Sequence, residues 1–459
     1  MATHTERLPH SPPDGSYPAE VTRDARVLPA RADQRSRLLG AIVEIVGDCG
    51  FPDAKVADIA RAAGVSRATF YELFGSKEGC ALAAQADLTA AFLADVEHAI
   101  ERSEPHLALQ GAVSGILEFA AREPLVFDFL THHAMLCGED ARGRRDAAVD
   151  HMEALVVRSW GRAAAEASSS DVPARFILEG AIRLLGLRAR RDSGDPTQVR
   201  DELMRWVDSY TVSRSPRWRE PVPDAGLLAL PFEHSGGLTV HPALPKGRHR
   251  LTSEVARSVQ RERIAYATAE AIREKGYAQI TVADIVATAG VSRDAFYSQF
   301  HDKDEAFDGA AQLVFEHLLA TMGGAFFGVA GEWADQLWEA GWAFDRFLES
   351  EPSLANFLFI ATYAPPARIA RVLDFVLAFS LFVEGGNQTR REGEELSRTI
   401  TEAIVCTVLE AVNYHVRHER VRDLRGLIPA ITYCVFAPFI GPDEADSFVQ
   451  TKAARALSP

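Results

Sequence analysis

Apolar residues recur at intervals of three and four along much of this chain, the spacing that places them on one face of an α-helix. One such run ends at Gly50, which predicts the end of a first helix. Two short helices are predicted next, over Val56–Ala63 and Arg67–Phe74. Gly64 suits the break between them because a tight turn between helices needs a left-handed backbone, and Ser66 is a favourable N-cap.

The periodic pattern continues after these helices, and most glycines and prolines fall between the periodic stretches. We therefore expect an all-α fold. The long helices expected in the first half cover 79–101, 107–121, 123–136, 141–167, 172–190 and 196–213, and those in the second half include 394–417 and 420–436.

The chain contains an internal duplication. Residues 37–80 and 263–306 are identical at 17 of 44 positions without a gap, at an offset of 226 residues. The identities include Gly64/Gly290, Ser66/Ser292 and Lys77/Lys303, and the run Val56–Ile59 is repeated at 282–285. This period is too long for a solenoid, so the sequence indicates two copies of a whole domain.

Two short helices joined by a glycine turn form a helix-turn-helix, whose second helix enters the major groove of DNA. Arg67 and Arg293 begin the predicted second helices, and an arginine fork matches the two acceptors of guanine. Helical spacing alone also fits a helical hairpin whose arginines are merely solvated.

The strings VADIARAAGVSRATFYELFGSKE and TVADIVATAGVSRDAFYSQFHDKDE resemble the DNA-binding segment of the TetR family of bacterial repressors. The resemblance implies that Thr281 caps its helix and touches phosphate, with Lys55 replacing it in the first copy. It also implies base-facing and backbone-gripping positions. The base-facing positions are Arg67, Ala68, Thr69, Arg293, Asp294 and Ala295, and the backbone-gripping positions are Tyr71, Lys77, Tyr297 and Lys303.

The charge of the chain lowers the affinity for DNA that we expect from these modules. The chain has a formal net charge of −15, and Asp294 and Glu72 add negative charge near the predicted DNA surface. We therefore expect modest affinity for DNA from each module. The alternative is a TetR-fold ligand sensor or protein-interaction module in which one or both DNA-binding modules are inactive.

The resemblance and the composition suggest a division into seven parts. They are a disordered tail (1–30), a first helix-turn-helix module (31–78), a first helical ligand-binding and dimerisation domain (79–212), a Pro/Gly-rich linker (213–250), a second module (251–304), a second helical domain (305–445) and a C-terminal tail (446–459). In TetR-type proteins the last two helices of each subunit form a four-helix bundle with those of the partner. We expect the two copies to pack in this way as an intrachain pseudo-dimer, which would read a DNA operator with two unlike half-sites.

The middle helices of such domains would enclose a small apolar or aromatic ligand, although an aromatic stripe is more often core. The candidate ligand-binding residues are Phe119, Phe127, His132, Met135, Trp160, Phe176, Trp338, Trp342, Phe357, Tyr363 and Phe379.

Other chemistry has little support in the sequence. The five cysteines are scattered, the pairs His132-His133 and His415/His418 lack an evident third ligand, and no phosphate loop or nucleophile motif occurs. We expect no enzyme activity, no cofactor and no metal. No run is long and apolar enough for a membrane span or signal peptide, so we expect a cytoplasmic repressor.

Overall fold

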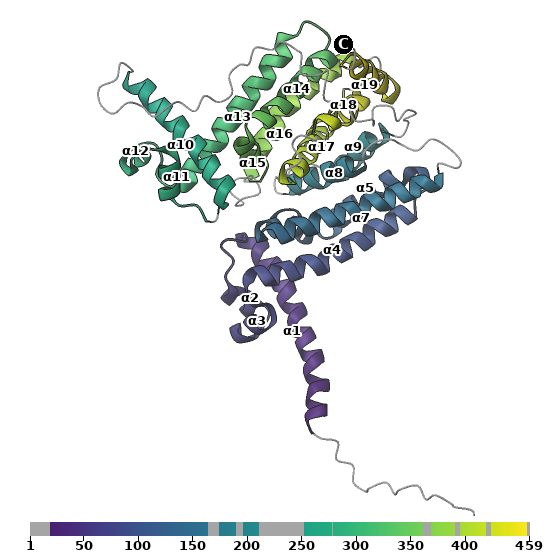
Figure 1. Ribbon diagram of the computed structural model, residues 1–459. Coiled ribbons are helices and arrows are strands. Elements are labelled where there is room, and N and C mark those ends of the chain that lie inside the picture. Colours follow the sequence, from purple (N-terminus) through teal and green to yellow (C-terminus); the bar gives the residue numbers. More distant parts are fainter. Residues whose placement is uncertain are drawn as a thin grey trace, which may run out of the picture. The chain divides into compact units, whose positions relative to one another are not determined.

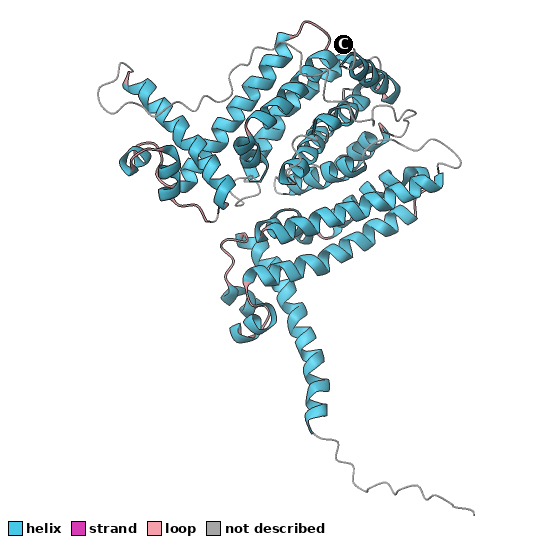
Figure 2. Ribbon diagram, in the orientation of Figure 1, coloured by secondary structure: helices cyan, strands magenta, loops and turns pink. Residues whose placement is uncertain are grey.

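The computed structural model describes residues 19–163, 174–189, 196–210, 252–277, 279–360, 369–390, 395–418 and 424–456. The expected linker and Tyr363 lie outside these ranges. Every regular element in the described ranges is a helix (Figure 2), as the sequence predicts. The chain forms two compact units, Met1–Ala84 and Gln85–Pro459.

The first unit consists of the first helix-turn-helix module. Its helices are α1 (Ala19–Cys49), α2 (Val56–Ala62), α3 (Arg67–Phe74) and the first turns of α4 (Lys77–Glu101). The apolar faces of the helices meet in a small core in which Leu38, Ile42, Ile59 and Phe70 are fully buried.

Helix α1 begins earlier than the sequence analysis predicts. Residues 19–30, which we assigned to a disordered tail, form its first turns. Four of the five prolines in residues 1–30 precede Ala19, and the stretch that follows is rich in alanine and arginine, which are good helix formers. Most of the prolines therefore lie before the residue at which the helix begins.

The second unit begins with the first helical domain. Its elements are α5 (Ala108–Arg122), α6 (Pro124–Asp128), α7 (Glu139–Ala163), α8 (Ala174–Ala189) and α9 (Pro196–Asp208), with the remainder of α4. The single helix predicted over 123–136 is instead α6 followed by a π-helical turn, η2 (Phe129–His133), and a 3-10 turn, η3 (Ala134–Cys137).

The same unit contains the second module and the second helical domain (Figure 1). The module is made of α10 (Ser253–Lys275), α11 (Val282–Ala289) and α12 (Arg293–Tyr297). The domain consists of α13 (Lys303–Gly328), α14 (Trp333–Ser350), α15 (Pro352–Ile360), α16 (Ile369–Glu384), α17 (Arg398–Arg417), α18 (Leu424–Ile440) and α19 (Pro442–Ala456).

The prediction of a C-terminal tail from residue 446 is wrong for residues 446–456, which belong to α19. Residues 446–456 continue a helix in which Ala445 and Val449 are fully buried. These two residues are four positions apart, which is the helical spacing of a buried face. The sequence therefore contains the apolar spacing of this helix, but the pattern extends over only one or two helical turns.

Helices of the two halves pack together within the second unit. Helix α17 contacts both α8 and α9. At the end of α9 the Tyr210 hydroxyl donates to the Cys434 carbonyl of α18 at 2.6 Å, and Trp206 Nε1 donates to the same hydroxyl at 2.8 Å. Helices α8 and α9 of the first half thus pack against α17 of the second (Figure 1), and Tyr210 extends the contact to α18.

Gly180 marks the closest approach of α8 and α17. A Cβ atom added to Gly180 would lie 3.0 Å from the backbone N and Cα of Thr407, and closer still to the Thr407 hydroxyl. Only a residue without a side chain allows the two backbones to approach this closely.

We expect Gly180→Ala to lower the free energy of unfolding by about 1–3 kcal/mol, because the added methyl group overpacks a backbone contact. Urea unfolding measures this change. Gly143→Ala is the matched control, since Gly143 lies in α7 with nothing within 4 Å of the added Cβ. The control should be neutral or stabilising by up to about 1 kcal/mol. Equal effects of the two substitutions would contradict the close approach.

Candidate DNA-binding modules and ligand cavity

The turns of both modules have the backbone that the sequence predicts. Gly64 has φ 63° and Gly290 has φ 62°, both in the left-handed region. Ser66 then caps α3 by accepting from the Thr69 amide at 3.0 Å, and Ser292 caps α12 in the same way at 3.1 Å from the Ala295 amide. Each second helix is therefore held at a fixed angle to the first.

The second helices bury one face and expose the other. Phe70 and Phe296 are fully buried, which anchors α3 and α12 to their modules. The tyrosines that follow them remain on the surface, with Tyr71 46% exposed and Tyr297 54% exposed. Other predicted DNA-facing residues share this surface, with Thr69 and Ala295 half-buried at its edge: Arg67, Ala68, Thr69, Arg293, Asp294 and Ala295.

The first helices of the two modules are capped differently. Thr281 accepts from the Asp284 amide, and the Asp284 carboxylate accepts in return from the Thr281 amide at 2.9 Å, forming a capping box. Lys55 takes this position in the first module, where it is exposed and provides no side-chain cap. Hydrogen bonds from Lys275 and Thr281 lower the pKa of Asp284 to about 2.

The structure adds an arginine to each module that the sequence analysis did not assign. Arg37 of α1 donates from Nη1 to the Ala63 carbonyl at 2.7 Å, immediately before Gly64. Arg263 of α10 donates to the Ala289 carbonyl at 2.6 Å in the second copy. The signal was the identity of Arg37 and Arg263 at the 226-residue offset, but a helical pattern does not say which distant carbonyl a side chain reaches.

The two predicted phosphate-binding lysines brace their own modules. Lys77 Nζ donates to the carbonyls of Phe51, Pro52 and Ala54 at 2.6–3.2 Å, which fixes the loop between α1 and α2. Lys303 Nζ lies 3.4 Å from the corresponding carbonyls of Tyr277 and Ile280. Both ammonium groups therefore have a structural role that the sequence analysis did not foresee.

The ligand candidates of the first half are packed into its core, with one exception. Phe92 packs edge-on against Phe119 and Phe127, with ring centroids 5.1 and 6.3 Å apart. Met135, Trp160 and Phe176 are likewise buried. The exception is His132, whose Nδ1 lies 3.0 Å from Asp128 Oδ1.

A cavity of about 110 Å³ lies in the second half, between α13, α14, α16, α17 and α18. Phe379, one of the predicted ligand-binding residues, lines this cavity. Trp338 and Trp342 instead form a separate buried cluster with Ile428. Phe357 packs against Phe307 with the rings tilted and their centroids 4.8 Å apart, between α15 and α13. The walls of the cavity are largely apolar: Met322, Leu337, Phe344, Leu348, Phe375, Phe382, Val405, Val408, Leu409, Val412 and Phe436.

One carboxylate, Asp345 of α14, belongs to the lining of this apolar cavity. Burial raises the pKa of Asp345 to about 6, against the opposing influence of Arg425. The Arg425 Nε donates to Asp345 Oδ2 at 3.2 Å, and the same guanidinium also pairs with Glu349. Among the described residues, the lining therefore combines aromatic walls with one carboxylate, a typical composition for a small-molecule site.

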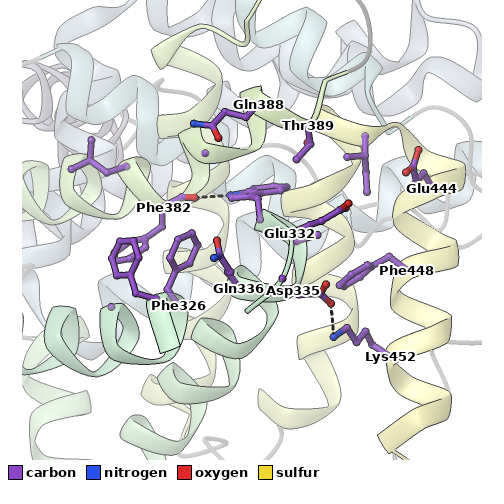
Figure 3. A pocket seen from close by; sticks show the side chains of 18 of the residues that line it. Phe326, Glu332, Asp335, Gln336, Phe382, Gln388, Thr389, Glu444, Phe448 and Lys452 are labelled. Carbon is purple, nitrogen blue, oxygen red and sulfur yellow. Dashed lines mark hydrogen bonds and ion pairs between the residues drawn. The ribbon is translucent and has the colours of Figure 1, made fainter. Parts of the chain in front are cut away.

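A larger groove of about 1290 Å³ opens beside α13, α14, α16 and α19 (Figure 3). Phe326, Phe382 and Phe448 form apolar parts of its wall. Asp335 and Lys452 face each other across it at 2.7 Å, as the dashed line in Figure 3 marks.

The histidines of both pairs lie against acceptor groups of the protein. His415 and His418 each place Nδ1 against the carbonyl four residues earlier, at 2.8 and 2.7 Å. His132 and His133 both face the Asp128 carboxylate. Within the described ranges no three His, Cys, Asp or Glu side chains are grouped to hold a metal ion. Among the helices described, α4 alone has the length and mean hydropathy of a membrane span, and part of it is buried in the protein.

Asp345 should make stability depend on pH. Its folded pKa of about 6 exceeds the ordinary value of 3.8, so the ionised form opposes folding above pH 6, and this cost fades as the pH falls. Between pH 7 and pH 5 we expect the free energy of unfolding to rise by about 1 kcal/mol relative to that of Asp345→Asn. Urea unfolding at both pH values tests this. The same change in unfolding free energy with pH in the unchanged protein and in Asp345→Asn would contradict this prediction.

Comparison with known proteins matches both modules to one family. The family model for bacterial regulatory proteins of the tetR family matches residues 38–84 and again residues 264–309. No curated protein matches the chain.

Three solved structures are similar to parts of the chain. The fatty acid degradation regulator FadR from Bacillus halodurans is 15% identical, covering 38% of this chain and 96% of its own, with a TM-score of 0.33. A TetR-like transcriptional regulator from Rhodococcus sp. RHA1 is 20% identical, with 37% and 91% covered and a TM-score of 0.29. A gamma-butyrolactone receptor, described as ArpA-like, is 16% identical, with 44% and 97% covered and a TM-score of 0.33.

The family match covers each helix-turn-helix together with the start of the helix that follows it, α4 or α13. The chain thus carries two DNA-binding domains of the tetR family of bacterial regulatory proteins in tandem.

Proposed function

We propose that this protein is a cytoplasmic, ligand-responsive transcriptional repressor whose two unlike modules read the two arms of one DNA operator. The observation that carries the proposal is the pair Arg67 and Arg293. Each arginine is exposed in the first turn of a second helix, after a turn fixed by the same glycine, serine and arginine contacts. Such a helix presents its first residues to base edges in the major groove.

The exposed residues suggest a division of roles. Arg67 and Arg293 suit guanine, while Tyr71 and Tyr297 stand one turn later and suit phosphate. Asp294 replaces Ala68 at the next position of the second module, and a carboxylate there favours a cytosine amine and repels phosphate. The two arms of the operator should therefore share a guanine and differ beside it.

The pairing of α8 and α9 with α17 and α18 supports an intrachain pseudo-dimer. TetR-type subunits pair through their last two helices, and here the corresponding helices of one chain contact each other. The two recognition helices of such a pair must lie about 34–36 Å apart to enter successive major grooves. A single chain would then provide both helices without an association step.

The cavity beside Asp345 supports ligand control. Helix α13 begins at Lys303, which braces the second module, and continues to Met322, which lines the cavity about 28 Å further along the helix. A ligand that enters the cavity and displaces α13 would also move the module attached to that helix. Binding of ligand and of DNA would then oppose each other equally.

Selection of bound fragments from random DNA, at low salt and without ligand, tests the DNA-reading proposal. We expect sites with two unlike arms. Arg67→Ala should abolish the preference for guanine in one arm and Arg293→Ala in the other, each with roughly a five- to 150-fold loss of affinity.

Arg102→Ala is the matched control, because Arg102 directly follows α4, is 56% exposed and pairs with Glu118 outside the modules. This variant should select the same sites as the unchanged protein. Perfect palindromes would mean that one module reads DNA and whole chains pair. A lack of any enrichment would instead indicate a ligand sensor or protein-interaction module.

Small aromatic ligands and a substitution that fills the cavity test ligand binding independently of DNA binding. Indole and toluene should stabilise the protein by about 1.4 kcal/mol at ten times their Kd. Gly341→Leu should abolish this, because Gly341 lines the cavity and a Cβ there meets nothing within 4 Å. Gly324→Leu, at an equally open position outside the cavity, is the control for thermal unfolding. Equal stabilisation of the two variants by indole or toluene would contradict the proposal that these ligands bind in the cavity.

A further inference from the structure

The contact between α8 and α17 buries charges from both halves of the chain. Arg183 Nε of α8 lies 3.3 Å from Glu410 Oε1 of α17, and Arg145 Nη2 of α7 donates to Glu410 Oε2 at 2.8 Å. Glu410 is 1% exposed and the two arginine side chains are 13% exposed or less. The charge of Glu410 is therefore compensated by the other half of the chain and hardly by water.

Two further ion pairs cross the same contact. Arg188 Nη2 of α8 donates to Glu402 Oε2 at 3.0 Å. Arg417 makes a bidentate pair with Asp146 at 2.8 and 2.9 Å, so here the first half provides the acid. Buried pairs add little net stability, but the loss of one partner is costly because the other charge stays buried. The main effect of these ion pairs is therefore to determine which helical surfaces can pack against each other.

The contacts define how the two helices correspond. Gly180 meets Thr407, Arg188 meets Glu402, and the Arg175 guanidinium lies 3.9 Å from the centre of the Tyr414 ring. The residue number rises along one helix as it falls along the other, so the helices run antiparallel. A two-fold rotation axis through the Gly180–Thr407 contact would exchange the two helices. It would superimpose each residue of α8 on the residue of α17 whose number is 227 higher, which is close to the 226-residue offset of the duplication.

This correspondence makes Arg183 and Glu410 equivalent positions, since 183 and 410 differ by 227. If two first halves paired in the same way, Arg183 would face a second Arg183. If two second halves paired, Glu410 would face a second Glu410. Each like pairing would bury two equal charges side by side, and it would also separate Arg188 from Glu402.

We propose that these buried charges restrict pairing to unlike halves, so that the first half accepts a second half and neither half accepts a copy of itself. The occupant of the first half's surface is then the second half of the same chain, because the covalent connection gives that half a high effective concentration. The charges work as a device of specificity, comparable to polar residues that fix partner choice in coiled coils. This inference does not depend on whether either module binds DNA.

A charge exchange tests the proposal in the full-length chain. Arg183→Glu alone and Glu410→Arg alone should each disrupt pairing within their own chain. Co-expressed with two different affinity tags, the two variants should complement each other in trans and co-purify at close to 1:1, at least tenfold above two tagged copies of the unchanged chain. The double variant Arg183→Glu/Glu410→Arg should return to a monomer by light scattering.

Two controls make the outcome decisive. Arg102→Glu reverses one charge of an exposed ion pair with Glu118 and should leave the chain monomeric. If either single variant is insoluble alone, recovery of soluble complex on co-expression supports the proposal. Single variants that stay monomeric with unchanged melting temperatures would overturn it, and so would a folded double variant whose two single variants fail to co-purify.

Discussion

The packing of α8 on α17 is the contact on which the rest of the second unit depends. It joins segments more than two hundred residues apart, and its close approach requires that Gly180 have no side chain. Around this point the helices bury apolar residues together with ion pairs that each need a partner from the other half. Because an unpaired buried charge is costly, the contact favours one partner as well as one geometry.

The duplication has kept the internal frame of the modules while changing their surfaces. Both turns use a left-handed glycine, a serine cap, an arginine on the preceding carbonyl and a lysine on the loop carbonyls. These contacts are internal, so either copy needs them whatever DNA it meets. Ala68 and Thr69 correspond to Asp294 and Ala295 in the second copy, and the side chains of Ala68 and Asp294 are exposed.

Local features were predictable from the sequence because local chemistry determines them. The left-handed Gly64, the Ser66 cap, the Thr281 cap and the extent of α3 all follow from residues within one turn of each other. The bond from Arg37 to Ala63 was not predictable, because it joins residues 26 positions apart.

The choice among aromatic residues had a similar limit. Trp338 and Phe379 both stand on apolar helical stripes, and only the packing of several helices decides that Phe379 alone of the two lines the cavity. The buried charges of α8 and α17 were missed for the same reason. A charged residue in a helical pattern is ordinarily solvated, and only a partner from the distant half makes its burial tolerable.

Helix α17 links the cavity to the contact between the halves. Val405, Leu409 and Val412 line the cavity, whereas Thr407, Glu410 and Tyr414 contact the first half. Within each set the residues follow the three- and four-residue spacing of one helical face, so the two faces share a single rigid element. A ligand that displaces α17 must also strain the ion pairs that cross from α17 to the first half. The interface that selects an unlike half is thereby placed where occupancy of the cavity can act on it.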